Sequence, residues 1–206
     1  MVNEHKFWVY DKVIPEHICD KIIKIGSNQK SGLGLTANKT FQEHKEDGIS
    51  ELMKYRNSDV TWLNENWIYK EISCVIKKAN IDADWNYDWD AMEPNQFTKY
   101  KLNQYYNWHI DSQEKNFDCP ENKVLHNKIR KLSMSLILSH PEEYEGGDFE
   151  FDFSNVELGT IRHNLKELTG KGSMVVFPSD TYHRVTPVTK GTRYSLVVWC
   201  VGKPFR

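Results

Sequence analysis

The apolar positions in the first part of the chain predict two amphipathic helices. Between Ile14 and Gly26 the isoleucines recur at helical spacing, Pro15 suits the first helical position, and Gly26 can end the helix. From about Trp62 to Asn80, isoleucine, valine and alanine again recur every three or four residues. Each segment therefore has one apolar face that can pack on a sheet.

After Asp82 the pattern changes to short apolar or alternating segments, which predict strands separated by glycine-containing turns. The predicted strands are 96–100, 105–111, 131–138, 148–153, 173–177, 184–188 and 193–201. Helices followed by a run of strands indicate an α+β fold. We expect a double-stranded β-helix, or jelly-roll, core with the N-terminal helices packed on one sheet.

The length of 206 residues suits one domain with a single core. We expect that domain to span residues 1–206, with a helical part to about residue 80 and a β-rich core over about 81–206. Residues 31–58 are polar and lack clear periodicity, which predicts a long surface loop. The sequence leaves open whether this loop is an ordered lid over a site or a disordered segment.

Composition and charge narrow the class of protein. Hydrophobic residues make up 39% of the chain and aromatic residues 13%, as in a globular protein. The net charge of -2 gives no support for a nucleic-acid partner, and no apolar run approaches the roughly 20 residues of a membrane helix. The N-terminus has no signal-peptide core, and the four cysteines are scattered without a CxxC pair. These features favour a cytoplasmic protein with reduced thiols over a disulfide framework or a zinc–thiolate site.

Two histidines, one aspartate and one arginine stand out as candidates for chemistry. His109 and Asp111 are two residues apart on a predicted strand, so their side chains face the same way, although most such pairs are not metal sites. His183 and Arg193 occur later, and an arginine that opens a buried strand requires an anionic partner. Two histidines and one carboxylate with open coordination positions form the facial triad of non-haem iron(II) oxygenases.

Several segments resemble motifs of the 2-oxoglutarate/iron(II)-dependent dioxygenase superfamily. The likeness is to its prolyl 4-hydroxylase-like branch, which includes the PKHD-type hydroxylases of bacteria and phages, and it covers about Arg56 to Trp199. Residues 93–100 resemble E-x-x-Q-x-x-x-Y, and residues 100–111 resemble Y-x-x-G-Q-x-Y-x-x-H-x-D. Further matching segments are the R-x-x-[ST]-x-x-L strand at 130–136, the G-G-[ED] turn within 145–148, and the spacing from Arg193 to Trp199.

The resemblance implies a role for each matching residue. His109, Asp111 and His183 would bind iron(II). Arg193 would pair with the distal carboxylate of 2-oxoglutarate, because a planar guanidinium matches a planar carboxylate. Tyr100 would donate its phenol to the same carboxylate. Dioxygen is the implied third reactant, with ascorbate as the expected reductant.

Four further residues correspond to positions around the substrate groove or cosubstrate pocket of that branch: Tyr106, Arg130, Glu93 and Trp199. Tyr106 lies three residues before His109, so on a regular strand it would face away from the metal. Its role therefore rests on the resemblance. Arg56-Asn57-Ser58 resembles an R-x-S segment of the same branch, and it suits either the edge of the active site or a surface loop.

This chain departs from the branch at three positions. Asn103 stands where the branch usually has glycine, and asparagine tolerates the left-handed backbone of such a turn. Phe149 stands where collagen-type enzymes often have a threonine that contacts the cosubstrate. Arg193 replaces their lysine, as in the PKHD-type proteins. These departures weaken the expectation of a collagen-like substrate.

The expected activity is hydroxylation of an aliphatic C–H group, with succinate and CO2 as coproducts, in a bacterial or phage-infected cell. A prolyl residue in a peptide or protein is the expected substrate. The first rival is a hydroxylase of a free amino acid or another small molecule, and the rival from another class is a non-catalytic jelly roll with a vestigial site. Asp111 argues against a halogenase, and the charge does not support a nucleic-acid demethylase.

Overall fold

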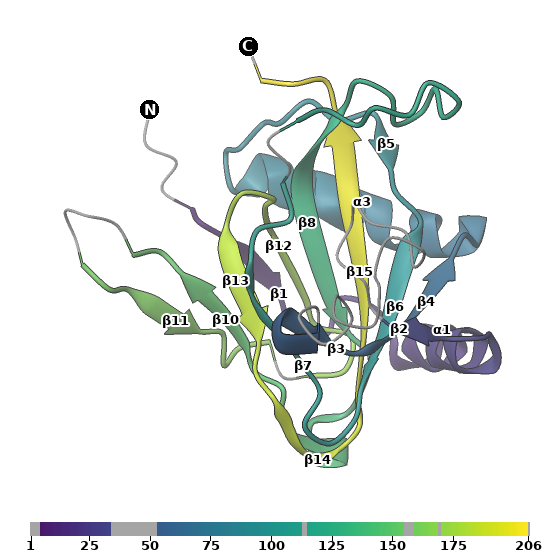
Figure 1. Ribbon diagram of the computed structural model, residues 1–206, viewed down its shortest axis with the longest axis vertical. Coiled ribbons are helices and arrows are strands. Elements are labelled where there is room, and N and C mark those ends of the chain that lie inside the picture. Colours follow the sequence, from purple (N-terminus) through teal and green to yellow (C-terminus); the bar gives the residue numbers. More distant parts are fainter. Residues whose placement is uncertain (1–4, 34–52, 113–114, 155–158, 169, 206) are drawn as a thin grey trace.

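The structure, a computed structural model, describes residues 5–33, 53–112, 115–154, 159–168 and 170–205. Two antiparallel sheets face one another, and two helices lie along the outer face of the larger sheet (Figure 1). The helices are α1 (Glu16–Asn28) and α3 (Asn66–Asp82), and a short 3-10 helix, η2, spans Pro141–Glu143.

The large sheet has the strand order β1 (Trp8–Tyr10), β12 (Met174–Pro178), β8 (Ile129–Ile137), β15 (Arg193–Gly202), β6 (Asn95–Tyr100), β4 (Asp59–Leu63) and β2 (Gly32–Leu33). A further short strand, β5 (Ala91–Met92), pairs with β15. The small sheet has the order β11 (Arg162–Asn164), β10 (Phe149–Asp152), β13 (Tyr182–Val185), β7 (Tyr105–His109) and β3 (Arg56–Asn57). Strands β14 (Val188–Gly191) and β9 (Tyr144–Gly146) form a two-stranded ribbon.

The two faces of the large sheet differ in chemistry. On β8, Leu132, Met134 and Leu136 are fully buried under the helices, together with isoleucines of α1 and α3. The alternate residues Ser133 and Ser135 are also buried, but they face the small sheet. The outer face therefore forms the main hydrophobic core, and the inner face leaves room for polar groups.

A second core of aromatic residues fills part of the space between the sheets. Phe149 and Phe151 of the small sheet contact Phe177 of the large sheet, with ring centroids 5.7 Å and 5.1 Å from it. The packing joins the two sheets at one end and leaves a cavity beside it.

Both predicted helices are present, with shifted ends. Helix α1 continues two residues beyond Gly26. This glycine is instead needed for packing inside the helix, because a Cβ atom at this position would come within 2.4 Å of the Phe97 ring. The expectation that Gly26 ends the helix is wrong. Helix α3 begins at Asn66, because Trp62 belongs to strand β4.

The predicted strand 184–188 is also wrong, because its residues divide between β13 and β14. Thr186 and Pro187 separate the two strands, and Pro187 has no N–H group with which to continue a ladder. The part of the chain before about residue 80 is not purely helical as expected. It also contains β1, β2, β3 and β4, which join the two sheets. Most of the predicted 31–58 loop lies outside the described residues, so the lid stays a prediction.

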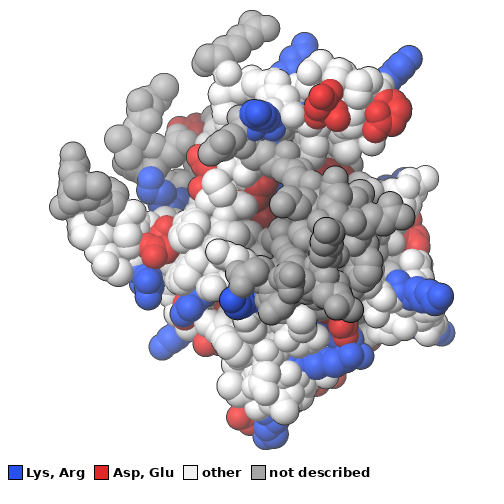
Figure 2. All heavy atoms as spheres, in the orientation of Figure 1, with Lys and Arg blue, Asp and Glu red and all other residues white. Residues whose placement is uncertain are grey.

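Two observations bear on partners. None of the helices in the described residues is long and apolar enough to cross a membrane. On the face shown in Figure 2, the basic and acidic side chains are interspersed instead of gathered by sign.

Candidate active site

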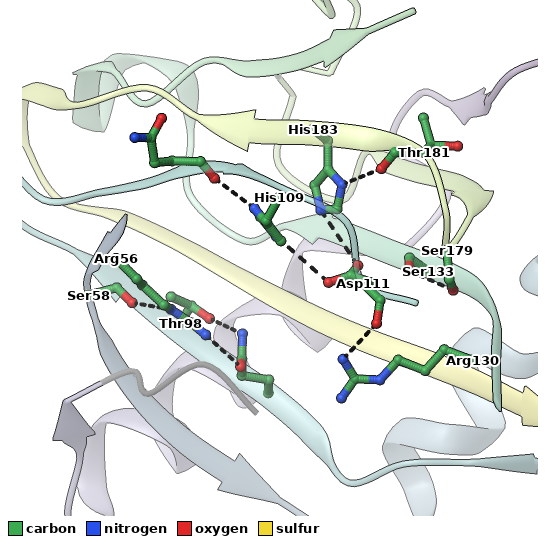
Figure 3. A network of polar contacts seen from close by, with 12 residues as sticks. Arg56, Ser58, Thr98, His109, Asp111, Arg130, Ser133, Ser179, Thr181 and His183 are labelled. Atoms are coloured by element: carbon green, nitrogen blue, oxygen red, sulfur yellow. Dashed lines mark hydrogen bonds and ion pairs between the residues drawn. The ribbon is translucent and has the colours of Figure 1, made fainter. Parts of the chain in front are cut away.

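His109, Asp111 and His183 come together at one end of the cavity between the sheets. His109 ends β7, and His183 lies opposite it in the neighbouring strand β13. Asp111 follows β7 by two residues, and the three ligand atoms offered by these side chains all lie within 4.8 Å of one another. Figure 3 shows both imidazoles pointing toward the Asp111 carboxylate.

Each imidazole has one nitrogen engaged by the main chain and the other free for a ligand. His109 Nδ1 lies 2.7 Å from the Asn107 carbonyl oxygen, and His183 Nδ1 lies 2.9 Å from the Thr181 carbonyl oxygen. A carbonyl only accepts, so both Nδ1 atoms carry the proton and donate it. The Nε2 atoms then present lone pairs, 3.7 Å and 3.5 Å from the two oxygens of Asp111.

The protonation states suit a divalent metal. Burial, followed by the neighbouring His183, lowers the pKa of His109 to about 3, so its imidazole is neutral at neutral pH. Burial would raise the pKa of Asp111, but His183, His109 and Arg130 outweigh it and hold that pKa below its usual range. A neutral imidazole at His109 and a carboxylate at Asp111 are the forms in which these side chains bind a divalent metal.

One unpaired atom tests whether a cation fits this site. Asp111 Oδ2 is buried and has no hydrogen-bond partner among the described residues. A buried carboxylate oxygen without a partner is costly, and a bound metal ion would satisfy it. The three residues therefore fit a metal ion in both geometry and charge.

Arg193 forms the second part of the site. It begins β15 with 1% of its surface exposed, and its Nε, Nη1 and Nη2 atoms all lack partners among the described residues. A buried guanidinium with no partner is a strong indication of a missing anion. Tyr100 lies opposite Arg193 in the ladder, and burial raises the pKa of its phenol, which stays protonated and able to donate.

Gly147 makes room for this arginine. Its φ of +65° is a left-handed conformation, and a Cβ atom there would lie 2.8 Å from Arg193 Cδ. Glycine tolerates both constraints, which explains the glycine at position 147 in the turn before β10.

One cavity adjoins the three metal-binding candidates and Tyr100. Arg193 is not among its lining residues, and its Cζ atom lies 5.5 Å from the centroid of the Tyr100 ring. The cavity is lined by Gln96, Tyr100, Tyr106, His109, Asp111, Ser135, Phe149, Phe177, His183, Val185, Ser195, Val197 and Trp199. A mostly apolar wall with a few converging polar groups is typical of a small-molecule site. The Phe149 ring stacks on His183 with centroids 5.5 Å apart, so this departure from the collagen-type enzymes covers one side of the metal site.

A β-bulge explains why Tyr106 faces the cavity. His183 pairs with His109, but Val185 pairs with Tyr106, so β7 has one residue more than β13 in this stretch. The extra residue reverses the alternation, and the Tyr106 ring stacks on His109 with centroids 3.5 Å apart. Regular strand geometry was therefore the wrong basis for placing this side chain.

Arg56 also packs on the Tyr106 ring. Its Cζ atom lies 4.4 Å from the ring centroid, and Nε donates to Ser58 Oγ at 2.9 Å. Arg56 Nη1 donates to Gln96 Oε1 at 3.3 Å. Of the two readings of the R-x-S segment, the structure supports the edge of the site.

The remaining predicted residues divide into two groups. Trp199 lines the cavity, but Glu93 and Arg130 are not among its lining residues. They form a buried ion pair beside Trp199, and Arg130 Nη1 donates to the Asp111 carbonyl at 3.2 Å. Motifs gave no signal for Ser179, whose carbonyl accepts the Asp111 N–H at 2.9 Å, because any residue type supplies a carbonyl.

The family follows from a sequence match that spans the whole site. Residues 95–201, just over half of the chain, match the 2OG-Fe(II) oxygenase superfamily. The chain belongs to this superfamily. All three metal-binding candidates and Arg193 fall inside the match, and the family's name refers to 2-oxoglutarate and iron(II).

Relatives of this oxygenase domain include PKHD-type hydroxylases, as the motifs predicted. The chain is 31% identical to one from Aliarcobacter butzleri over 165 residues, which are 80% of this chain and 61% of the relative. It is 34% identical to one from Delftia acidovorans over 107 residues, 52% of this chain and 42% of the relative. The chain thus spans less than two thirds of these relatives' lengths.

Solved structures of prolyl hydroxylases share the fold. The collagen prolyl hydroxylase of Paramecium Bursaria Chlorella virus-1, in a complex with 2-oxoglutarate, has a TM-score of 0.65 at 20% identity, covering 98% of this chain and 99% of that one. A prolyl-4-hydroxylase of Pseudomonas putida has a TM-score of 0.64 at 15% identity, covering 98% and 95%. The predicted jelly-roll architecture with N-terminal helices is confirmed.

Proposed function

We propose that this protein is an iron(II)- and 2-oxoglutarate-dependent dioxygenase that hydroxylates an aliphatic C–H group and releases succinate and CO2. The observation that carries the proposal is a pair of buried unsatisfied groups, one lining the cavity and one beside Tyr100 of its wall. Asp111 Oδ2 and all three nitrogens of the Arg193 guanidinium have no hydrogen-bond partner within the described part of the chain. Iron(II) and a dicarboxylate would satisfy both, and the family uses those two components.

Each residue of the site has a distinct role in this proposal. His109, Asp111 and His183 would hold the iron, and Arg193 and Tyr100 would hold the distal carboxylate of 2-oxoglutarate. When bound, iron and 2-oxoglutarate activate O2 for hydroxylation. The apolar wall, including Phe149 and Phe177, keeps water away from the reacting groups.

The proposed substrate is a prolyl residue in a peptide or protein. Tyr106 and Trp199 present aromatic rings to the cavity, and a pyrrolidine ring packs well on such a face. The PKHD-type relatives and the prolyl hydroxylase folds support this choice. So does a prolyl hydroxylase from Trichoplax adhaerens in a complex with a hypoxia inducible factor peptide fragment, with a TM-score of 0.62 at 14% identity.

The cavity lining favours a peptidyl substrate over a free amino acid. A free amino acid brings an ammonium group, which needs a carboxylate inside a closed pocket. Among the residues that line this cavity, Asp111 is the one carboxylate, and it belongs to the metal site. Glu93 is already paired with Arg130.

Two smaller parts of the proposal concern conditions. Ascorbate is the proposed reductant, and its omission from an assay should reduce the number of turnovers before activity fades. A cytoplasmic location is supported by the cysteines, all four of which are free.

We predict that proline-containing peptides stimulate 2-oxoglutarate turnover more than free L-proline does. A peptide library, free amino acids and a no-substrate control would be compared by succinate release, with mass spectrometry to locate an added oxygen atom. Hydroxylation of a free amino acid without any peptide product would replace the peptidyl substrate by the small-molecule rival. Absence of succinate under every condition would favour the vestigial jelly roll.

A further inference from the structure

Asp111 depends on main-chain contacts for its position. It lies beyond the end of β7, and its Oδ2 atom receives no hydrogen bond from the described residues. The Asp111 N–H donates to the Ser179 carbonyl at 2.9 Å, and the Ser112 N–H donates to the same oxygen at 2.8 Å. The Asp111 carbonyl accepts from Arg130 Nη1 at 3.2 Å. Figure 3 shows the last contact on the side of Asp111 away from the histidines.

Arg130 is held in place by its own partners. Nε donates to Glu93 Oε1 at 2.5 Å, and Nη2 donates to Glu93 Oε2 at 2.8 Å, so the pair is bidentate. The Trp199 ring covers the guanidinium, with its centroid 3.9 Å from Cζ. Arg130 is 8% exposed and Glu93 is 7% exposed.

Arg130 and Arg193, two of the buried arginines near the site, therefore differ in kind. All three nitrogens of Arg130 have protein partners, whereas all three nitrogens of Arg193 have none among the described residues. The unpartnered guanidinium of Arg193 suits an incoming anion. The guanidinium of Arg130 is already hydrogen-bonded through all three nitrogens, which suits a group that holds Asp111 in place.

A β-bulge aims Arg130 at this carbonyl. Arg130 pairs with Val201 and Leu132 pairs with Cys200, so Lys131 is an extra residue on β8. Without it, the alternation that puts Ser133 inside would place Arg130 on the opposite face. The Lys131 carbonyl also accepts the Ser179 N–H at 3.0 Å, so consecutive residues hold both Asp111 and its main-chain partner.

We propose that Glu93 and Arg130 are positioning residues that set the direction of the Asp111 carboxylate, instead of groups that bind the substrate directly. The inference rests on the proposed function in that Asp111 is taken as a metal ligand. Arg130 holds the main chain from which the carboxylate projects, and Glu93 holds Arg130. Groups that orient metal ligands typically change metal affinity by about 10- to 100-fold when they are removed.

Cobalt(II) binding to the full chain, without 2-oxoglutarate or O2, tests this role separately from turnover. The main variant is Arg130→Met with Glu93→Gln, which removes both buried charges together and avoids leaving one uncompensated. Arg130→Lys is the second variant, because one ammonium group keeps the charge but cannot bridge Glu93 and Asp111 as a fork does. Circular dichroism and the thermal midpoint show whether each variant is folded.

The chain offers a matched control on the outer face of the small sheet. Arg184 donates Nε to Glu150 at 2.7 Å and adjoins the ligand His183, but it points away from the cavity. Arg184→Met with Glu150→Gln removes a more exposed ion pair of the same residue types without touching Asp111. Its cobalt(II) affinity should stay within about twofold of the wild type.

We expect the Arg130 variants to bind cobalt(II) about 10- to 100-fold more weakly and to change its visible absorption spectrum. The inference would be overturned if folded Arg130→Lys and the folded double variant both bound cobalt(II) with the affinity and absorption spectrum of the wild type. A raised KM for peptide in the same variants would then assign Arg130 and Glu93 a direct role in substrate binding. A wild type that binds no cobalt(II), or binds it without Asp111, would instead contradict the proposed function itself. The two failures are therefore distinct.

Discussion

At the scale of single residues, what matters is which atoms of a side chain are already engaged. His109 and His183 each donate Nδ1 to a carbonyl, which leaves Nε2 for a metal. Alternation along a strand predicted from the sequence that His109 and Asp111 would converge. The sequence could not predict that the carbonyls of Asn107 and Thr181 orient the two rings, because every residue type has the same backbone carbonyl.

The first residue-scale prediction concerns the metal. His109→Ala, Asp111→Ala and His183→Ala should each abolish turnover and greatly weaken iron(II) binding, because each removes one of three ligands. The fold should survive, since none of the three belongs to the main hydrophobic core. Anaerobic iron titration and circular dichroism check both statements. Near-normal iron affinity in any one variant would remove that residue from the ligand set.

The second concerns the cosubstrate. Arg193→Met should weaken 2-oxoglutarate binding by about 2–5 kcal/mol while iron affinity changes little, because it removes one partner of a desolvated charge pair. Tyr100→Phe should cost less, about 0.5–1.5 kcal/mol or somewhat more for a charged acceptor. Calorimetric titration of the metal-loaded protein measures both. Equal 2-oxoglutarate affinity in the wild type and Arg193→Met would contradict the assignment.

At the scale of elements, two β-bulges place the side chains that a regular strand would misdirect. One in β7 turns Tyr106 to the same side as His109, and one in β8 turns Arg130 toward Asp111. The apolar pattern predicted both strands, but a bulge depends on the partner strand across the ladder. Sequence alternation alone therefore could not show where the register shifts.

Gly26 provides an element-scale prediction. In an exposed helix, glycine to alanine adds about 1 kcal/mol of stability. Here the new Cβ would lie 2.4 Å from the ring of Phe97, which is 2% exposed and packed in the core. Gly26→Ala should therefore lower the free energy of unfolding by about 1–2 kcal/mol, since overpacking outweighs the helix preference. Urea denaturation measures this.

Ser27→Ala is the control for that variant. Ser27 is the next residue of α1 and is exposed, so its change should be neutral or slightly stabilising. If Gly26→Ala were as stable as Ser27→Ala, the close packing of α1 on β6 would be wrong.

At the scale of the whole molecule, one face of the large sheet forms the main hydrophobic core and the other face contributes to the candidate site. The outer face packs on α1 and α3, and the inner face contributes Arg193, Ser195 and Trp199 to the site. Hydrophobic periodicity predicted the two helices and most long strands. Strands of two or three residues such as β2, β3 and β5 were missed, because so few residues show no period and pair through long-range contacts.

The central claim is that one cavity binds iron(II) through His109, Asp111 and His183 and 2-oxoglutarate through Arg193. The most direct measurement is succinate release from 2-oxoglutarate by the purified protein, with iron(II), O2 and a peptide library supplied or withheld in turn. We predict succinate equal to the 2-oxoglutarate consumed when all are present, none from His183→Ala, and recovery in Arg193→Met at high 2-oxoglutarate. Undiminished succinate from His183→Ala, or none from the iron-loaded wild type with any peptide or amino acid, would contradict the account.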